Sequence, residues 1–201
     1  MQQRQAFSPV ARVGVELFAP GERLRDPQPG DFILTHGSAL ISKIIRFGQR
    51  LRIHGDDRKY THWNHAALIV DSDGSIIEAL GRGITRRSLD DYKPTEYQLI
   101  RIDAAKEDRA QAVAFAESCV GQPYAWFTIA SISISLLTGG KFAFGFEGQH
   151  ICSGLVARAL ERTSAIFNRM PTHIMPADLA KYYQVDPPAV GAPIGTPPPT
   201  L

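Results

Sequence analysis

A cysteine and the residues that follow it are the first candidates for chemistry in this sequence. Cys152 lies where a loop meets an expected helix, and Ser153 and Gly154 come directly after it. The N-terminus of a helix carries partial positive charge and free backbone N–H groups, which lower the pKa of a thiol and stabilise an oxyanion. The small neighbours also let a carbonyl group approach the backbone. The pattern indicates a nucleophile; the alternative is a buried, inert cysteine.

A histidine at the start of an apolar segment is the candidate base. His65 begins residues 65–70 (HAALIV), Asp73 and Gly74 form a turn signal, and residues 75–80 (SIIEAL) return as the partner strand. We expect positions 65 and 78 to face each other, so that Glu78 binds the second ring nitrogen of His65. An unpaired carboxylate in an apolar strand is costly. The alternative is that Glu78 is an edge charge that points to solvent.

The hydrophobic pattern places these residues in a domain of the α+β class. Strands are expected at residues 32–34, 65–70 and 75–80, shortly after residue 83, and at 97–102. Helices are expected to begin near residues 38, 106, 152 and 176. A strand-rich half therefore precedes a helix-rich half that carries Cys152.

The length and composition fit one globular domain. The chain has 201 residues, of which 44% are hydrophobic and 21% charged, and its formal net charge is +2. A charge this small gives no reason to expect a nucleic-acid partner. We expect an N-terminal arm over residues 1–21, the domain over residues 22–186 and a flexible, proline-rich tail over residues 187–201.

Several classes of protein are disfavoured by the sequence. Two cysteines, Cys119 and Cys152, do not form a disulfide framework. Without a signal peptide or a long apolar run, the cytoplasm is the default location, and delivery by a phage or a secretion system stays open. His62 and His65 form an H-x-x-H pair with no third ligand at a familiar spacing, so no metal is expected. No phosphate loop or dinucleotide fingerprint is present, so no cofactor is expected.

Several motifs occur in the order of one known family. Residues 120–126 (VGQPYAW) and 152–156 (CSGLV) resemble the G-x-P-Y-x-W stretch and the nucleophile helix of NlpC-type papain-like cysteine peptidases. Here the histidine strand precedes the cysteine helix. That order is similar to the circularly permuted branch, the YiiX-like proteins related to lecithin:retinol acyltransferases. Residues 29–34 (PGDFIL), 63–68 (WNHAAL) and 77–79 (IEA) resemble the motifs of that branch.

The resemblance implies a circularly permuted papain-like fold, an antiparallel sheet or barrel packed on a helical half. It implies Cys152 as nucleophile, His65 as general base and acid, and Glu78 as the group that orients His65. The substrate-binding residues that it implies are Tyr124, Ser153 and Trp63. The reaction passes through a thioester on the cysteine. We expect a hydrolase of amide or ester bonds in N-acyl or lipid substrates or in peptidoglycan peptides. An acyltransferase that uses the same site and a non-catalytic ligand-binding module of the same fold are the alternatives.

An apolar insert separates the two halves of the family pattern. Residues 126–137 (WFTIASISISLL) alternate apolar residues with serine from Ile129, which fits a strand, and a packed helix fits equally well. As a core element the insert has no direct role. If exposed, residues 126–146 line an acyl-chain groove or contact a membrane surface. The expected partner is thus a small molecule, a lipid or a cell-wall peptide, and the sequence does not give the oligomeric state.

Overall fold

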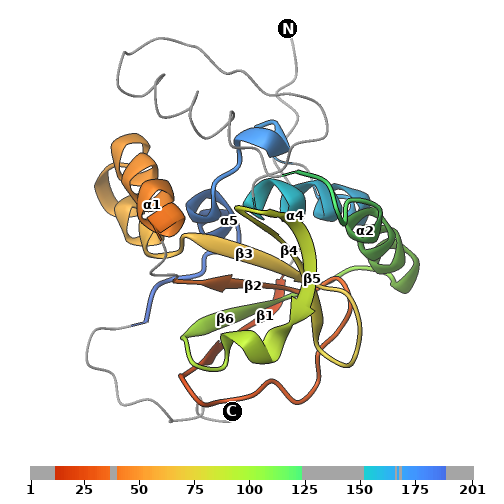
Figure 1. Ribbon diagram of the computed structural model, residues 1–201. Helices are drawn as coiled ribbons and strands as arrows, with labels where there is room; N and C mark the ends of the chain where they lie inside the picture. The colour runs from red at the N-terminus through yellow and green to blue at the C-terminus, as the bar shows by residue number, and fades with distance from the viewer. Residues whose placement is uncertain (1–11, 37–39, 124–151, 166, 168, 189–201) are drawn as a thin grey trace, which may run out of the picture.

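A six-stranded antiparallel sheet forms the centre of the structure (Figure 1). The computed structural model describes residues 12–36, 40–123, 152–165, 167 and 169–188. Across the sheet the strands follow the order β1-β6-β2-β3-β4-β5, and every neighbouring pair is antiparallel. Their bounds are β1 Arg12–Phe18, β2 Phe32–Thr35, β3 His65–Ile69, β4 Ser75–Leu80, β5 Gly83–Ser88 and β6 Tyr97–Ile102. The sheet is open, because β1 and β5 lie at its two edges.

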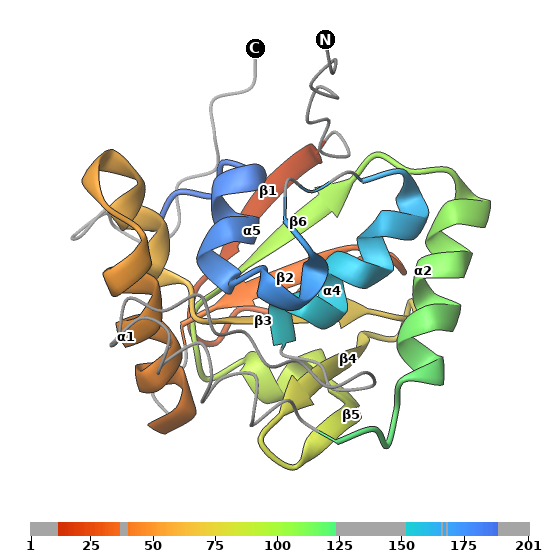
Figure 2. The same cartoon turned by 90° about the horizontal axis from the view of Figure 1, so that it is seen from above.

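Helices cover one face of this sheet. Figure 2 shows α2, α4 and α5 over the sheet, with α1 beside them. The bounds are α1 Leu40–Arg52, α2 Lys106–Ser118, α4 Cys152–Leu160 and α5 Pro176–Tyr182. Within the described residues, the connections between elements contain four short 3-10 helices, η1 Gly55–His62, η2 Leu89–Tyr92, η3 Glu161–Thr163 and η4 Pro171–His173. The predicted α+β class, with strands first and helices after them, is confirmed.

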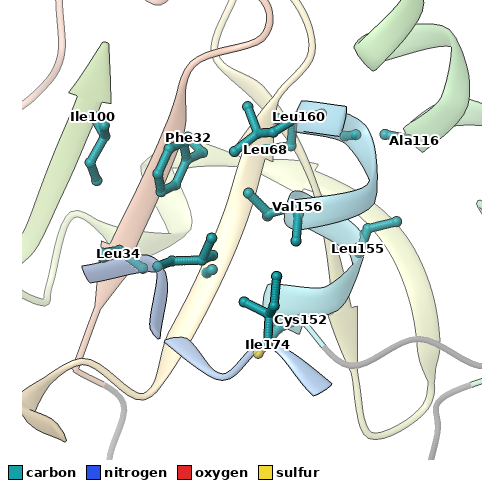
Figure 3. Packing of buried hydrophobic residues seen from close by; sticks show 14 of the residues in the cluster. Phe32, Leu34, Leu68, Ile100, Ala116, Cys152, Leu155, Val156, Leu160 and Ile174 are labelled. Atoms are coloured by element: carbon teal, nitrogen blue, oxygen red, sulfur yellow. The ribbon is translucent and has the colours of Figure 1, made fainter. Parts of the chain in front are cut away.

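The alternation of side chains along each strand divides the core into two clusters. Phe32, Leu34 and Leu68 point toward the helices, where Val156 and Leu160 of α4 meet them (Figure 3). The residues between them in sequence belong to a second cluster, whose members from the strands are Ile33, Ala67, Ile69, Ile76, Tyr97 and Leu99. Successive side chains of a strand point to opposite faces of the sheet, so a short apolar run supplies both clusters.

The loop of the β3–β4 hairpin is longer than the expected two-residue turn. The N–H of Val70 donates to the carbonyl of Ser75 at 2.9 Å, which leaves residues 71–74 as the loop. The carboxylate of Asp71 accepts hydrogen bonds from the backbone N–H groups of Asp73 and Ser75. Such an aspartate stabilises a local turn, and here it selects the longer connection.

The register of the hairpin corrects one expectation. Leu68 pairs with Ile77, so Glu78 lies opposite Ala67 and not opposite His65. His65 and Glu78 are diagonal neighbours on the same face of the sheet, a separation that long side chains bridge. Their side chains do meet, as described below.

Residues 29–31 (PGD), directly before β2, have a structural role. Gly30 adopts φ +91°, in the left-handed region where glycine is unstrained. The buried carboxylate of Asp31 then accepts from the backbone N–H of Ile102 at 3.1 Å and from Nη1 of Arg109 at 2.8 Å. Burial raises the pKa of Asp31 even though Arg109 and Arg101 lower it. The PGD motif therefore ties α2 to the sheet.

The edges of the domain differ from the expected ones at the N-terminus. Arg12–Phe18 forms the edge strand β1 and pairs with β6, within the segment that was assigned to an arm. Val13, Val15 and Leu17 alternate with Arg12, Gly14 and Glu16, a period-two pattern that fits a strand and that the sequence analysis did not use. At the other end Val185 is fully buried. Among the described residues, no helix has the length and apolar character needed to cross a membrane.

Candidate active site

Cys152 is the first residue of α4, and the core fixes its position. Every residue of α4 except Arg158 is buried. A helix that is buried all round cannot rotate or slide without loss of packing. The helix packs against β3 and β4, and the side chain of Cys152 is 1% exposed at its N-terminal end. This end is where the helix dipole favours a negative charge on sulfur.

His65 is the first residue of β3 and lies between the thiol and a carboxylate. Its Nε2 is 2.5 Å from Oε2 of Glu78. The ring also forms a hydrogen bond with the sulfur of Cys152. Because Nε2 is occupied by Glu78, Nδ1 is the nitrogen that faces the thiol. The structure thus brings together the three residues that the sequence assigned to catalysis.

The contacts between these groups shift both pKa values toward an ion pair. Burial lowers the pKa of His65, but the negative charge and hydrogen bonds of Cys152 and Glu78 outweigh it and raise the pKa to about 10. Burial raises the pKa of the Cys152 thiol, yet the charge and hydrogen bond of His65 bring it below its ordinary value. Backbone hydrogen bonds from Ala66 and Ser153 act in the same direction. Both shifts favour a thiolate beside an imidazolium over a neutral thiol beside a neutral imidazole.

Glu78 is a buried carboxylate with three side-chain donors. It is 0% exposed. Oε2 accepts from His65 and from the hydroxyl of Tyr92, and Oε1 lies 3.3 Å from Nη1 of Arg87. Burial raises the pKa of Glu78, but His65, Tyr92 and Arg87 together hold it below its ordinary value. The carboxylate consequently stays ionised and keeps the imidazole of His65 protonated and oriented.

Tyr92 and Arg87 are site residues that the sequence analysis missed. Arg87 lies on β5, and because Glu78 pairs with Thr85, Arg87 is its diagonal neighbour on the same face of the sheet. Tyr92 ends η2, and its ring stacks beside the His65 ring with centroids 6.1 Å apart. The period-two spacing from Thr85 to Arg87 was a usable signal once the β4–β5 register is known. The position of Tyr92 had no such signal.

The structure gives Ser153 a structural role for its side chain. The Ser153 hydroxyl is fully buried and donates to the carbonyl of Ile174 at 2.6 Å. That bond ties α4 to the segment before α5. Only the backbone N–H of Ser153 is directed toward the sulfur of Cys152. A contact between Ser153 and a substrate therefore involves the backbone and not the hydroxyl.

Trp63 does not offer a surface to a substrate. Its side chain is 0% exposed, and its indole N–H donates to the carbonyl of Val185 at 3.0 Å. The assignment of Trp63 to substrate binding is therefore replaced by a role in the core, where it anchors the C-terminal end of the domain. Tyr124, the third predicted substrate-binding residue, lies outside the described residues, and so does the apolar insert 126–146.

A second polar cluster lies at the same end of the sheet as His65. Arg46 donates to Nε2 of His36 at 2.9 Å, and Nδ1 of His36 lies 2.7 Å from the carbonyl of His62. The two imidazoles stack with centroids 4.6 Å apart. Burial, together with His36 and Arg46, lowers the pKa of His62 even though Glu96 acts against it. In the described part of the chain, no three histidine, cysteine, aspartate or glutamate residues are grouped to hold a metal.

Comparison with known proteins does not assign this chain to a family or a function. The chain matches no protein-family model, and no curated protein is significantly similar to it. The interpretation of the site therefore depends on its geometry. A thiolate at a helix N-terminus, an imidazolium within hydrogen-bonding distance and a buried carboxylate behind it can attack an acyl carbonyl and protonate the leaving group.

Proposed function

We propose that this protein is a cysteine hydrolase that cleaves an amide or ester bond through a thioester on Cys152. The observation that carries the proposal is the hydrogen-bonded chain from Cys152 through His65 to Glu78. Each member is buried and held by a separate element, α4, β3 and β4. A buried ion pair is costly unless hydrogen bonds compensate for it, and the contacts that favour a thiolate–imidazolium pair here support use of the site in catalysis.

The proposed mechanism assigns one role to each group. The Cys152 thiolate attacks the acyl carbonyl, and backbone N–H groups at the first turn of α4 bind the developing oxyanion. The His65 imidazolium donates its Nδ1 proton to the departing amine or alkoxide, which leaves a thioester and a neutral imidazole. His65 then takes a proton from water, and the resulting hydroxide attacks the thioester. The carboxylic acid is released, and Cys152 returns to the thiolate form. Glu78 holds the ring and remains ionised throughout.

The finer proposal for the fold is the circularly permuted NlpC-type, papain-like arrangement. It is supported by the order of the elements, because β3 and β4 with His65 and Glu78 precede α4 with Cys152. It is supported also by the packing of α4 against these two strands. For substrates we propose acyl bonds of N-acyl or lipid compounds first and peptidoglycan peptides second.

The test is a pH titration of Cys152 alkylation by iodoacetamide, with Cys119→Ser as the common background. Cys119 is buried and its pKa is raised, so the parent protein supplies an unactivated thiol as reference. We expect labelling of Cys152 well below pH ~8.5 and loss of that labelling in His65→Ala. An ordinary thiol curve in both proteins refutes the catalytic pair.

Turnover provides the second part of the test. With a fluorogenic acyl substrate, the protein should form a Cys152 thioester that mass spectrometry detects, and Cys152→Ala should abolish it. Activity should fall at low pH when the Cys152 thiolate is protonated, and at high pH when His65 loses its proton at about pH 10. Release of the acyl group to an added amine or alcohol in preference to water would identify a transferase instead.

A further inference from the structure

The outer face of α1 carries exposed apolar and basic side chains together. Lys43, Phe47, Arg50 and Leu51 are spaced at i, i+4, i+7 and i+8, so they share one face of the helix. All four are exposed, Phe47 to 58% and Leu51 to 39%. The other exposed large apolar residues of the described chain, Leu17, Val120 and Met170, lie singly on other parts of the fold. The α1 face is therefore where exposed apolar side chains gather.

The inner face of α1 is anchored through polar contacts. Nε2 of Gln49 donates to the carbonyl of Trp63 at 2.9 Å, and Oε1 of Gln49 accepts from the N–H of Ala177 at 2.8 Å. Arg52 bonds to Asp178 and, at 3.2 Å, to the carbonyl of His173. These contacts fix the orientation of α1 without Phe47 and Leu51. The two apolar side chains are thus exposed on a helix that is already held in place.

The charge of α1 selects the kind of partner. The helix contains Lys43, Arg46, Arg50 and Arg52 but no aspartate or glutamate. Arg46 bonds to His36 and Arg52 to Asp178, whereas no ion pair described in this structure involves Lys43 or Arg50. On the adjacent η1, Asp57 is neutralised by Lys181. An aromatic residue and a leucine beside cations that have no ion-pair partner among the described residues are typical of a helix that lies in a membrane interface.

We propose that the outer face of α1 docks this protein on a membrane surface that contains anionic lipids. Phe47 and Leu51 enter the boundary between headgroups and acyl chains, while Lys43 and Arg50 remain among the lipid phosphates and carboxylates. Figure 1 shows α1 at the side of the domain. The proposal does not depend on the proposed hydrolase activity.

The test is co-sedimentation of the full chain with vesicles of phosphatidylcholine and phosphatidylserine (3:1), compared with phosphatidylcholine alone. We expect binding to the anionic vesicles that weakens at high salt. A basic residue near an anionic surface contributes about five-fold in affinity. Combined Lys43→Gln and Arg50→Gln should therefore weaken binding on the order of 25-fold. Combined Phe47→Ser and Leu51→Ser should abolish it.

Matched controls separate this face from charge and apolar exposure in general. Combined Arg25→Gln and Lys106→Gln removes two exposed cations elsewhere, and Leu17→Ser removes an apolar side chain of similar exposure, 43%. Both control proteins should bind as the parent does. Equal losses in controls and α1 variants, or equal binding to the two kinds of vesicle, overturns the proposal.

A second measurement does not depend on loss of binding. In Phe47→Trp on a Trp126→Phe background, the new indole should be quenched by brominated acyl chains in anionic vesicles, whereas the buried Trp63 of the Trp126→Phe parent should not be. Absence of quenching overturns the proposal. The proposal is also overturned if the protein binds single-stranded nucleic acid but no vesicles, and if combined Lys43→Gln and Arg50→Gln removes the nucleic-acid binding.

Discussion

Replacing Tyr92 with phenylalanine isolates one hydrogen bond of the Glu78 carboxylate. The Tyr92 hydroxyl donates to Oε2 of Glu78, and phenylalanine keeps the ring beside His65 while removing only that donor. A hydrogen bond to a charged group contributes ~1.5–3 kcal/mol, and one to a neutral group ~0.5–1.5 kcal/mol. The difference, about 1–1.5 kcal/mol, favours the ionised form of Glu78 and corresponds to roughly one unit in its pKa.

The pH dependence of this effect has a definite sign. The pKa of Glu78 in the folded protein lies below its ordinary value, so the carboxylate stabilises the fold above the ordinary pKa and loses that contribution as pH falls through the folded-state pKa. Tyr92→Phe raises the folded-state pKa. Its cost in free energy of unfolding should therefore be largest at pH 7 and about 1 kcal/mol smaller once Glu78 is protonated.

Urea unfolding at pH 7 and at a pH below the Glu78 transition measures the two costs. Tyr97→Phe is the matched control, because Tyr97 is a buried tyrosine whose hydroxyl is close to the backbone of Leu24 and not to Glu78. Its cost should be the same at both pH values. An equal cost of Tyr92→Phe at both pH values, or none at pH 7, refutes the assignment of Tyr92 as a donor to an ionised carboxylate.

Three further substitutions test the surroundings of the site. Glu78→Gln should lower the pKa of His65 and slow the alkylation of Cys152 at pH 6; an unchanged rate would show that the carboxylate does not act on the pair. Ser153→Ala should cost ~1–3 kcal/mol of unfolding free energy, because the Ile174 carbonyl loses its donor, while the pH profile of alkylation stays in place. Arg109→Leu removes a partner of the buried Asp31 and should cost ~3–5 kcal/mol in urea unfolding at pH 7. The Arg109→Leu cost should shrink when acid protonates Asp31.

Local patterns predicted most of the elements. The expected strand at residues 97–102 matches β6 Tyr97–Ile102, and the expected helix from residue 176 matches α5 Pro176–Tyr182. Apolar spacing determines such segments because each buries one face. The strand β1 was missed even though Val13, Val15 and Leu17 alternate as in a strand, because the segment was assigned to an N-terminal arm. The roles of Trp63 and of the Ser153 hydroxyl also escaped, because both depend on carbonyl groups far away in the sequence, at Val185 and Ile174.

The pairing of His65 with Glu78 was predicted correctly even though the register was wrong, and the reason is geometric. The expected hairpin set position 78 opposite 65, whereas the observed pairing of Leu68 with Ile77 sets it opposite 67. The error is two residues, and side chains two residues apart on a strand share a face. An error of one residue would have turned Glu78 to the helical face of the sheet. Predicting such a pair from sequence therefore requires that both residues be placed on the correct face of the sheet. A register error of two residues does not matter, because a glutamate side chain is long enough to bridge it.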